Sequence, residues 1–391
     1  IPGNAGTLKI ADNIQEDISK FYSVYKILKK KNIDIVIIGP EQPLVDGLVD
    51  YLNKKNIKVF GPNKFASQLE GSKSFMKNLC KSNNIPTASF GVFDNYEDAS
   101  KFIKKNKVPI VVKADGLAAG KGVSICKSKK GALKNVQEIL NGKFKSSNKV
   151  LLEEYLEGEE LSYFILADKN SYCFFGSAQD HKKVGEADKG PNTGGMGAYS
   201  PSPLLTEDLD KKIKTKIIEP TLKAIKKLGH PYKGFLYAGL MIDKNEPYLI
   251  EYNIRMGDPE CQVLMMRLKT DLLEVIEHTI NNKIKNLKIK WSKKKSLTVV
   301  LCAKGYPASY IKNSQIKNLN KITQNENNQI FHAGTYERKK KIYSNGGRVL
   351  NVTSLSTNLK KAREKALDNI NKIDWADGFY RKDIGWRTID S

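Results

Sequence analysis

The sequence contains only five cysteines among 391 residues, and none of them forms a C-x-x-C pair. Such sparse cysteines argue against a zinc site or a disulfide framework and are typical of a reducing cytoplasm. No apolar run approaches the roughly 18 residues that a bilayer-spanning helix needs. The first residues, IPGNAGTLKIADN, lack the charged-then-apolar layout of a signal peptide. We therefore expect a cytoplasmic protein with no membrane partner.

Acidic residues are too few to balance the basic ones, with 42 Asp and Glu against 66 Lys and Arg, a formal net charge of +24. A surplus of this size can mark a nucleic-acid binder. The lysines are spread thinly, however, and the densest runs, KILKKKN, KWSKKK and ERKKKI, lack interleaved aromatics in a recognised nucleic-acid module. We expect no nucleic-acid partner and a preference for anionic small substrates. A basic nucleic-acid-binding protein is the alternative from another functional class.

Apolar segments near the N-terminal end predict a parallel α/β layer. Residues 33–62 contain an apolar run, a helix-like segment (LVDGLVDYLNKK) and a second apolar run. The first run, 35–38, is typical of a strand buried on both faces of a parallel sheet. Short βα repeats of this kind imply a doubly wound layer. The segment SKSFMKNLCKSNN is expected to follow as a helix.

The middle and C-terminal parts predict hairpins and therefore an α+β organisation. Residues 108–128 read as strand, glycine-rich loop and strand. Residues 234–255 read as two antiparallel strands joined by a turn at Lys244 and Asn245. After Asn282, SLTVVLCAKGYP and GGRVLNVTSLS begin a third, smaller α+β unit. The chain is long enough for roughly two to four domains.

The segment KADGLAAGKGV, residues 113–123, has the composition of a phosphate-binding flap. Its three glycines allow backbone turns that side chains would block, and such loops present N–H groups to phosphate oxygens. Lys113 and Lys121 add positive charge beside them. The segment is neither a P-loop nor a dinucleotide fingerprint, because no Ser or Thr follows Lys121 and the chain continues as a strand. A plain β-turn loop is the alternative.

The segment LLEEYLEGEELS, residues 151–162, places four glutamates around a tight glycine, Gly158. A strand edge together with carboxylates suits the recognition of an adenine amino group and ribose hydroxyls. A solvated acidic turn explains the same residues equally well, so both interpretations stay open at this point.

In the segment EYNIRMGDPECQ, residues 251–262, an acid, an amide and a cation occupy alternate positions. If the segment is a strand, its period of two puts Glu251, Asn253 and Arg255 on one face. The two oxygen-bearing side chains could bind Mg²⁺, and the arginine could hold a phosphoryl or carboxylate group bidentately. Metal and arginine together would spread the charge of a transferring phosphoryl. An ordinary solvent-facing surface is the alternative.

The order of these three motifs resembles that of the ATP-grasp ligases. More closely, six stretches resemble the glycinamide ribonucleotide synthetases, also called phosphoribosylamine–glycine ligases, over essentially all 391 residues. Each stretch alone is weak, whereas six in the same order are specific. The six are PGNAGT (2–7), GPEQPLVDG (39–47), KADGLAAGKGV (113–123), QDHKKVGEADKGPNTGGMGAYSP (179–201), EYNIRMGDPECQ (251–262) and GYP (305–307).

The resemblance implies an ATP-grasp core of mixed α/β and α+β class, with an N-terminal doubly wound parallel-sheet domain and a small C-terminal α+β domain. We expect these at 1–69, 70–285 (with a flap subdomain at about 88–157) and 286–391. Family members begin with a strand and a glycine-rich loop before PGNAGT, so we expect that either the sequence is a fragment or its N-terminal sheet lacks the first strand.

The resemblance also implies a reaction. Glycine's carboxylate attacks the γ-phosphate of ATP, and the amine of 5-phosphoribosylamine then attacks the glycyl phosphate. The products are glycinamide ribonucleotide, ADP and phosphate. ATP is the co-substrate, Mg²⁺ or Mn²⁺ the metal, and we expect a monomer acting on small molecules. No covalent enzyme nucleophile is required, so catalysis would depend on positioning and charge stabilisation.

Residues at matching positions take roles from the family. The implied nucleotide-binding residues are Lys73 and Lys113 at the phosphates, Gly120, Lys121 and Gly122 in the flap, Glu153, Glu154 and Leu156 at adenine, and Glu160 at the ribose. The implied substrate residues are Gly3, Asn4, Gly6, Glu41, Asp180, Lys182, Asn192, Thr193, Gly194, Arg255 and Asp258. Arg255, Asp258 and Lys113 are the implied catalytic residues. Glu251 and Asn253 are the implied metal ligands.

Some features depart from the family or leave choices open. Met256 stands where the family usually has Phe, a tolerable apolar exchange. For His181, in the central stretch, a substrate contact and a structural role are equally open, whereas we expect His332 to be structural. Another ATP-grasp ligase, a biotin-type carboxylase or an inactive nucleotide-binding fragment are the remaining alternatives. The first two of these lack DKGPNTGGMGAYSP.

Overall fold

The computed structural model describes residues 1–118, 122–144 and 147–389. Its N-terminal layer contains the expected parallel pair, β1 (Ile35–Ile37) with β2 (Lys58–Phe60). Burial of β1 on both faces was a wrong expectation: Ile37 is 53% exposed, and Ile35 and Val36 are only partly buried. The helix between the strands is divided by Gly47, whose φ of 98° is left-handed and ends a helical run.

The helices of this layer begin before β1 and continue past β2. They are α1 (Phe21–Lys30), α2 (Glu41–Asp46), α3 (Leu48–Asn53), α4 (Gln68–Gly71) and α5 (Lys73–Ser82). The predicted helix SKSFMKNLCKSNN is confirmed by α5, which starts where the Ser72 hydroxyl accepts a hydrogen bond from the Phe75 N–H.

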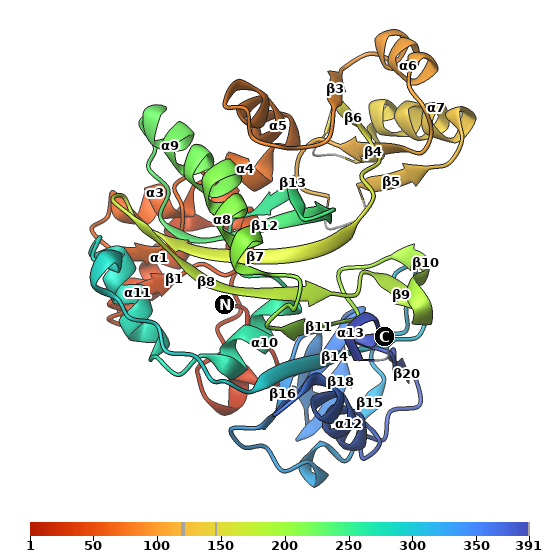
Figure 1. The fold of residues 1–391 in the computed structure, drawn as a ribbon. Helices are drawn as coiled ribbons and strands as arrows, with labels where there is room; N and C mark the ends of the chain where they lie inside the picture. Colours follow the sequence, from red (N-terminus) through yellow and green to blue (C-terminus); the bar gives the residue numbers. More distant parts are fainter. Residues whose placement is uncertain (119–121, 145–146, 390–391) are drawn as a thin grey trace.

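The flap part of the molecule is a separate antiparallel sheet that projects from the rest (Figure 1). Its strands lie in the order β3 (Phe90–Phe93), β6 (Val150–Glu154), β4 (Ile110–Ala114) and β5 (Val123–Cys126). The helices α6 (Tyr96–Lys105) and α7 (Lys129–Glu138) pack on it, because alternate residues Ile110, Val112 and Ala114 of β4 face them. The expected strand, loop and strand at 108–128 are confirmed, although residues 119–121 lie outside the described residues.

A nine-stranded sheet forms the body of the molecule. Its main path is β13 (Glu246–Asn253), β12 (Gly234–Asp243), β7 (Glu159–Ala167), β8 (Tyr172–Asp180), β11 (Gly197–Ser200), β14 (Lys295–Ala303), β19 (Arg348–Ser356) and β16 (Asn328–His332), with β20 (Gly378–Phe379) paired to β14. The predicted hairpin of β12 and β13 is confirmed. Its turn residues, Lys244 and Asn245, both have the positive φ that matches the twist of two antiparallel strands.

Helices cover both faces of the body's sheet, and β7 explains why. Tyr163 and Ile165 pack with α8 (Glu207–Ile213) and α9 (Glu219–Lys227), whereas Phe164 and Leu166 pack with α10 (Glu260–Arg267) and α11 (Leu272–Ile280). A strand buried on both faces is apolar at every position. The segment LSYFILA in β7 has this character, apart from the hydroxyls of Ser162 and Tyr163, both of which are hydrogen-bonded.

The C-terminal α+β unit has its own core but not its own main sheet. Its strands β14 and β19 are present as expected, and α12 (Leu359–Ile370) packs on them. However, β14 also pairs with β11, so the sheet runs continuously from the middle region into this unit (Figure 1). The third α+β unit that the sequence predicts is therefore joined to the middle region through its sheet, because β14 covers the edge of β11 that would otherwise be unpaired.

The remaining elements are short or lie outside the main sheets. The strands are β9 (Lys183–Gly185), β10 (Lys189–Asn192), β15 (Gln315–Ile316), β17 (Thr335–Arg338) and β18 (Lys341–Ser344). The helical elements are α13 (Trp386–Ile389), the 3-10 helices η1 (Thr7–Lys9), η3 (Glu186–Asp188), η5 (Ile284–Asn286) and η6 (Leu319–Lys321), and the π-helices η2 (Ile139–Lys143) and η4 (Lys214–Ile218). Among the described residues, no helix combines the length and the apolar character needed to cross a membrane.

Candidate active site

A cleft of about 550 Å³ opens between the N-terminal layer, the flap and the body's sheet. Many of the sequence-predicted site residues line it together. They are Glu41, Lys73, Gly122, Asp180, Lys182, Thr193, Gly194, Glu251, Asn253, Arg255 and Asp258. These residues come from five separated parts of the chain, so the fold unites the motifs that the sequence presents apart.

The alternating segment that begins at Glu251 has the predicted facing. Tyr252 and Ile254 are 2% and 1% exposed and pack in the core, although Tyr252 also borders the cleft, while the partly exposed Glu251, Asn253 and Arg255 line it. The shared face is therefore confirmed. The strand itself ends at Asn253, two residues earlier than the sequence predicted. The reason is that the Ile254 N–H donates to the Glu70 carboxylate (2.8 Å) instead of continuing the ladder.

Glu251 and Asn253 could bind a divalent cation whose remaining coordination positions are filled by water or by a bound small molecule. Neither side chain forms a hydrogen bond or ion pair with any described residue. Burial alone would raise the pKa of Glu251, but nearby Lys182, Lys113 and Lys73 outweigh it and hold the pKa below its ordinary value. Over the described ranges, no group of three or more His, Cys, Asp or Glu residues could hold a metal. One carboxylate and one amide suit Mg²⁺, which keeps several waters and binds through few protein oxygens.

Arg255 is held by two carboxylates from the N-terminal layer. Its Nε donates to Glu41 (2.9 Å) and its Nη2 donates to Glu70 (3.1 Å). Burial raises the pKa of Glu70 to about 7, although the charge of Arg255 opposes the rise. Glu70 also lines the cleft. Glu70 was not identified as a site residue in the sequence analysis. The only feature of the sequence that points to it is its position just before the helix that carries Lys73.

The two predicted phosphate lysines differ in exposure. Lys73 lines the cleft and donates to the Gly116 carbonyl at the base of the flap loop (2.6 Å). Lys113 is only 4% exposed and pairs with Glu153 at 2.7 Å. The other carboxylate oxygen of Glu153 faces the fully buried Lys77 at 2.9 Å. Sequence reasoning also missed Lys77, whose spacing of four residues from Lys73 puts both on one side of α5.

The other residues predicted around adenine are less enclosed. Glu154 is exposed and accepts hydrogen bonds from the N–H and hydroxyl of Ser89 (2.8 and 3.1 Å). Leu156 is partly exposed beside it. Gly120 and Lys121 lie outside the described residues, while Gly122 lines the cleft.

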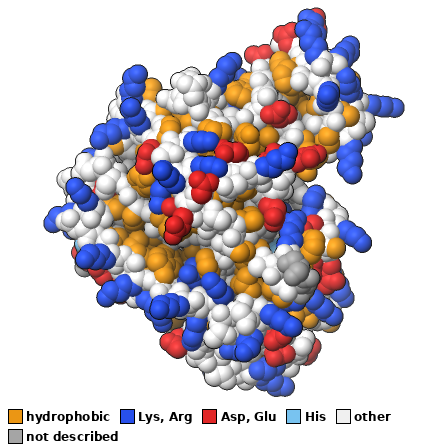
Figure 2. All heavy atoms as spheres, in the orientation of Figure 1, with side chains coloured by type: hydrophobic (Ala, Val, Ile, Leu, Met, Phe, Trp, Pro, Cys, Tyr) orange, Lys and Arg blue, Asp and Glu red, His pale blue; other side chains and the backbone are white. Residues whose placement is uncertain are grey.

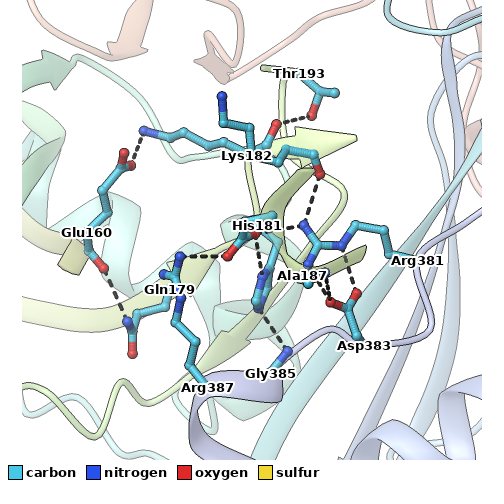
Figure 3. Close-up of polar contacts among 12 residues, drawn as sticks. Glu160, Gln179, His181, Lys182, Ala187, Thr193, Arg381, Asp383, Gly385 and Arg387 are labelled. Atoms are coloured by element: carbon cyan, nitrogen blue, oxygen red, sulfur yellow. Dashed lines mark hydrogen bonds and ion pairs between the residues drawn. The ribbon is translucent and has the colours of Figure 1, made fainter. Parts of the chain in front are cut away.

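The central stretch contributes a half-buried aspartate and a half-buried lysine to the cleft. Burial raises the pKa of Asp180 to about 8, with Lys182 opposing and Glu260 adding to the rise. The Lys182 ammonium pairs with Glu160 at 2.5 Å (Figure 3). Its backbone carbonyl accepts from the N–H and hydroxyl of Thr193 (2.7 and 2.9 Å). The predicted ribose residue is thus already engaged by a predicted substrate residue.

Arg348 joins this stretch to the predicted catalytic aspartate. Its Nη2 pairs with the Asp258 carboxylate at 2.9 Å, and its Nη1 donates to the carbonyls of Gly194 and Asp258, both at 2.6 Å. Arg348 comes from the C-terminal unit, and sequence reasoning missed it. The one local signal in the sequence is the pair of glycines that precedes Arg348. Gly347 is required there because a Cβ would collide with the Tyr306 ring, so the backbone beside Arg348 is closely packed.

The predicted loop at Gly3, Asn4 and Gly6 lies elsewhere, against the C-terminal unit. The Asn4 side chain accepts from the Gly6 N–H (2.8 Å) and donates to the His332 carbonyl (2.7 Å). His332 also contacts the Thr335 hydroxyl through Nδ1 (3.0 Å), as its expected structural role requires. Neither this loop nor Asn192 is among the residues that line the cleft.

Three family models match the chain in succession. They are described as phosphoribosylglycinamide synthetase N domain (residues 1–70), ATP-grasp (A) domain (71–261) and C domain (296–387). The chain belongs to the phosphoribosylglycinamide synthetase family. It has the ATP-grasp fold of that family, which the expected fold class included.

Curated relatives and solved structures agree with membership of the synthetase family. The phosphoribosylamine–glycine ligase of Brucella melitensis is 44% identical over 389 residues, covering 99% of this chain and 91% of that protein. The chloroplastic phosphoribosylamine–glycine ligase of Arabidopsis thaliana is 46% identical over 99% of this chain and 75% of its own length. The crystal structure of the Thermotoga maritima phosphoribosylamine–glycine ligase matches with a TM-score of 0.85 and 33% identity, over 98% of this chain and 92% of that one.

A biotin carboxylase domain from Hydrogenobacter thermophilus shares only the fold with this synthetase-family chain. It matches with a TM-score of 0.72 at 18% identity, over 95% of this chain and 83% of that one. The biotin-type alternative from the sequence is therefore set aside in favour of the synthetase family, whose models match residues 1–261 and 296–387.

Proposed function

We propose that this chain joins glycine to 5-phosphoribosylamine at the expense of ATP, giving glycinamide ribonucleotide, ADP and phosphate. Its relatives across the family are named for this ligation. The observation that carries the proposal is the convergence on one cleft of a carboxylate–amide pair, a held arginine and the lysines Lys73 and Lys182. This set matches the needs of a carboxylate that must be phosphorylated before an amine can attack it.

The chain's own residues supply positioning and charge. Lys73 and Lys113 would hold the phosphate oxygens, and Gly122 leaves room for the flap backbone to approach them. Glu251 and Asn253 would hold Mg²⁺, which when bound neutralises phosphate charge. Arg255 would face the transferring phosphoryl.

Two further groups stand beside the reacting carboxylate. Asp258, fixed by Arg348, would hold glycine's amine through its carboxylate. Asp180 and Lys182 would contact the second substrate, while Glu153, Glu154, Leu156 and Glu160 would hold the adenosine. Attack by glycine's carboxylate oxygen breaks the bond between the γ-phosphorus and the bridging oxygen of ATP. Attack by the amine then expels phosphate and loses one proton.

We also propose a monomer that acts only on small molecules in the cytoplasm. In Figure 2 the Lys and Arg side chains are spread over the whole visible face rather than gathered in one stripe, as a nucleic-acid groove would require. The domain boundaries at 69 and 285 likewise stay proposals. Sedimentation at several concentrations would test the monomer.

A coupled ADP-release assay tests the function. Phosphoribosylamine is generated in situ, and reactions omit glycine, phosphoribosylamine or Mg²⁺ in turn. We expect ADP release only with all three present, and glycinamide ribonucleotide in the products by mass spectrometry. ADP release that does not respond to the omission of glycine would refute the proposal. Nucleotide binding without any release would instead support a chain that binds ATP but does not ligate.

A further inference from the structure

A segment near the C-terminal end wraps around the loop that directly follows Lys182 (Figure 3). The loop, residues 183–188, consists of the short strand β9 and the helical turn η3, and the segment is residues 381–387. Arg381, only 1% exposed, lies at the centre of the contact. Its Nε and Nη2 donate to the two carboxylate oxygens of Asp383 (2.8 and 2.7 Å). Its Nη1 donates to the Lys183 carbonyl (3.0 Å) and to the Asp188 carboxylate (2.9 Å), so one guanidinium joins both ends of the loop.

Three further contacts complete this clasp, the name used here for residues 381–387. Arg387 donates to the second oxygen of Asp188 (2.6 Å). The Ala187 N–H donates to the Asp383 carboxylate (2.8 Å), and the Lys382 N–H donates to the Glu186 carboxylate (3.2 Å). A buried charge is tolerated only when its partners satisfy it, and the planar fork of Arg381 meets four acceptors at once.

The clasp holds a loop conformation that the loop sequence does not favour. Ala187 and Asp188 have φ of 50° and 53°, two consecutive residues other than glycine in the left-handed region. For an alanine this conformation is sterically unfavourable, and such backbone persists only where the surroundings impose it. Here the surroundings are the Asp383 carboxylate on the Ala187 N–H and the two arginines on the Asp188 carboxylate.

His181 links the clasp to the cleft. It lies between Asp180 and Lys182 in sequence and is 4% exposed. Its Nε2 accepts the Gly385 N–H at 2.8 Å, so the ring proton is on Nδ1, which lies 3.6 Å from the Asp188 carboxylate. Burial lowers the pKa of His181, in keeping with a neutral ring. Of the two roles that the sequence left open for His181, these contacts favour the structural one.

We propose that the clasp is a positioning device for the ligation, with Arg381 as its central positioning residue: by holding loop 183–188 and the His181 ring, it sets where Asp180 and Lys182 stand in the cleft. The inference rests on the proposed function, which assigns Asp180 and Lys182 to the second substrate. None of the clasp residues lines the cleft, so they act only through others. Misplacing a substrate-positioning group by about 1 Å can cost on the order of 100-fold in rate.

The test uses graded variants of the full chain. Arg387→Gln removes one half-exposed contact to Asp188, and Arg381→Lys keeps the charge but loses the fork. Lys382→Gln is the matched control, because it changes an exposed side chain of the same segment and keeps the backbone N–H that contacts Glu186. We expect kcat to fall about threefold or more for Arg387→Gln and about tenfold or more for Arg381→Lys, with KM for ATP within about twofold. The control should match wild type, and Arg387→Gln should melt within a degree or two of it.

A rescue variant separates strain from simple contact loss. Glycine adopts a φ near 50° without steric penalty. Ala187→Gly in the Arg387→Gln background should therefore recover part of the lost kcat. No recovery would overturn the idea that the clasp holds a strained loop. The positioning role as a whole is overturned if both arginine variants keep the wild-type kcat, or if kcat falls only in step with melting temperature and ATP affinity.

Hydrogen exchange distinguishes failure of this inference from failure of the proposed function. If the wild-type chain shows no glycine-dependent ADP release, the function fails, yet the clasp can still be judged. In Arg381→Lys and Arg387→Gln, amide exchange in residues 183–188 should rise about tenfold or more above the Lys382→Gln control, while the flap sheet stays unchanged. Exchange equal to that of the control would overturn the clasp, whatever the activity.

Discussion

Lys113 and Glu153 form an ion pair with 2.7 Å between Nζ and Oε2, on the adjacent strands β4 and β6 of the flap sheet. Both side chains are nearly inaccessible to solvent. Lys77 of α5 completes the group from the other side of Glu153. The flap is therefore tied by charge to the helix that carries Lys73, and the lysine expected at the nucleotide phosphates is prepositioned by a carboxylate.

We predict that Lys113→Ala weakens nucleotide binding while the chain stays folded. Loss of one charge-assisted contact to phosphate should cost about 1.5–3 kcal/mol of binding free energy. Calorimetric titration with a non-hydrolysable ATP analogue measures it. Lys127→Ala, exposed next to the same sheet, is the control and should bind as wild type. An affinity for Lys113→Ala equal to that of the control would rule out the phosphate role.

We predict that Lys77→Met destabilises the chain far more than Lys81→Met on the same helix. Lys77 is fully buried, and its loss leaves one oxygen of Glu153 without a cation, whereas Lys81 is exposed. Breaking a buried pair from one side costs about 3 kcal/mol or more. Urea unfolding followed by circular dichroism gives the comparison. Equal midpoints for the two variants would mean that Lys113 alone satisfies Glu153.

We predict that Glu251→Gln raises the Mg²⁺ concentration needed for half-maximal activity by about tenfold or more, since a lost charged ligand costs at least about 1.4 kcal/mol. The substitution keeps the shape of the side chain and removes its charge. Titrating Mn²⁺ in the presence of an ATP analogue by electron paramagnetic resonance reads the metal site without turnover. Glu246→Gln, at the half-exposed start of the same strand, should leave both readouts unchanged. A Glu251→Gln variant with wild-type metal affinity would contradict the ligand role.

We predict that Arg255→Lys lowers turnover by about tenfold or more with little effect on ATP affinity, because only the planar fork can hold Glu41, Glu70 and a phosphoryl oxygen together. The ammonium keeps the charge, so loss of activity would report geometry. Arg338→Lys, exposed on β17, is the control. Steady-state kinetics with ATP and glycine varied separately give the result. An equal fall in ATP affinity would point to a nucleotide contact instead.

We predict a pH-dependent stability difference between wild type and Glu70→Gln. Burial raises the pKa of Glu70 from 4.5 to about 7 in the folded state. Between these values the folded state keeps a proton that the unfolded state has released, so rising pH favours unfolding by up to about 1.4 kcal/mol per pH unit. Below pH 4.5 and above pH 7 the contribution is constant. Glu70→Gln should therefore gain stability relative to wild type between pH 4.5 and 7. A difference that stays flat over this window would contradict the raised pKa.

Local chemistry alone determined several features of this protein. The facing of Glu251, Asn253 and Arg255 follows from the two-residue period of a strand, which needs no knowledge of neighbours. The turn at Lys244 and Asn245 and the strand–loop–strand form of the flap follow from equally local patterns. Motif order was enough to indicate the family, because each motif keeps its spacing within a short stretch of chain.

Only the tertiary structure decided which charges meet. Arg255 pairs with Glu70, which lies 185 positions away in the sequence. Arg348 pairs with Asp258, 90 positions away, and Arg381 pairs with Asp188, 193 positions away. No periodicity connects residues so far apart, and a charged side chain looks the same in sequence whether it is solvated or buried. The junction of β11 with β14 was hidden for the same reason. Strand pairing is set by which edge is left open after the chain has folded, and that is a property of the whole sheet rather than of either strand.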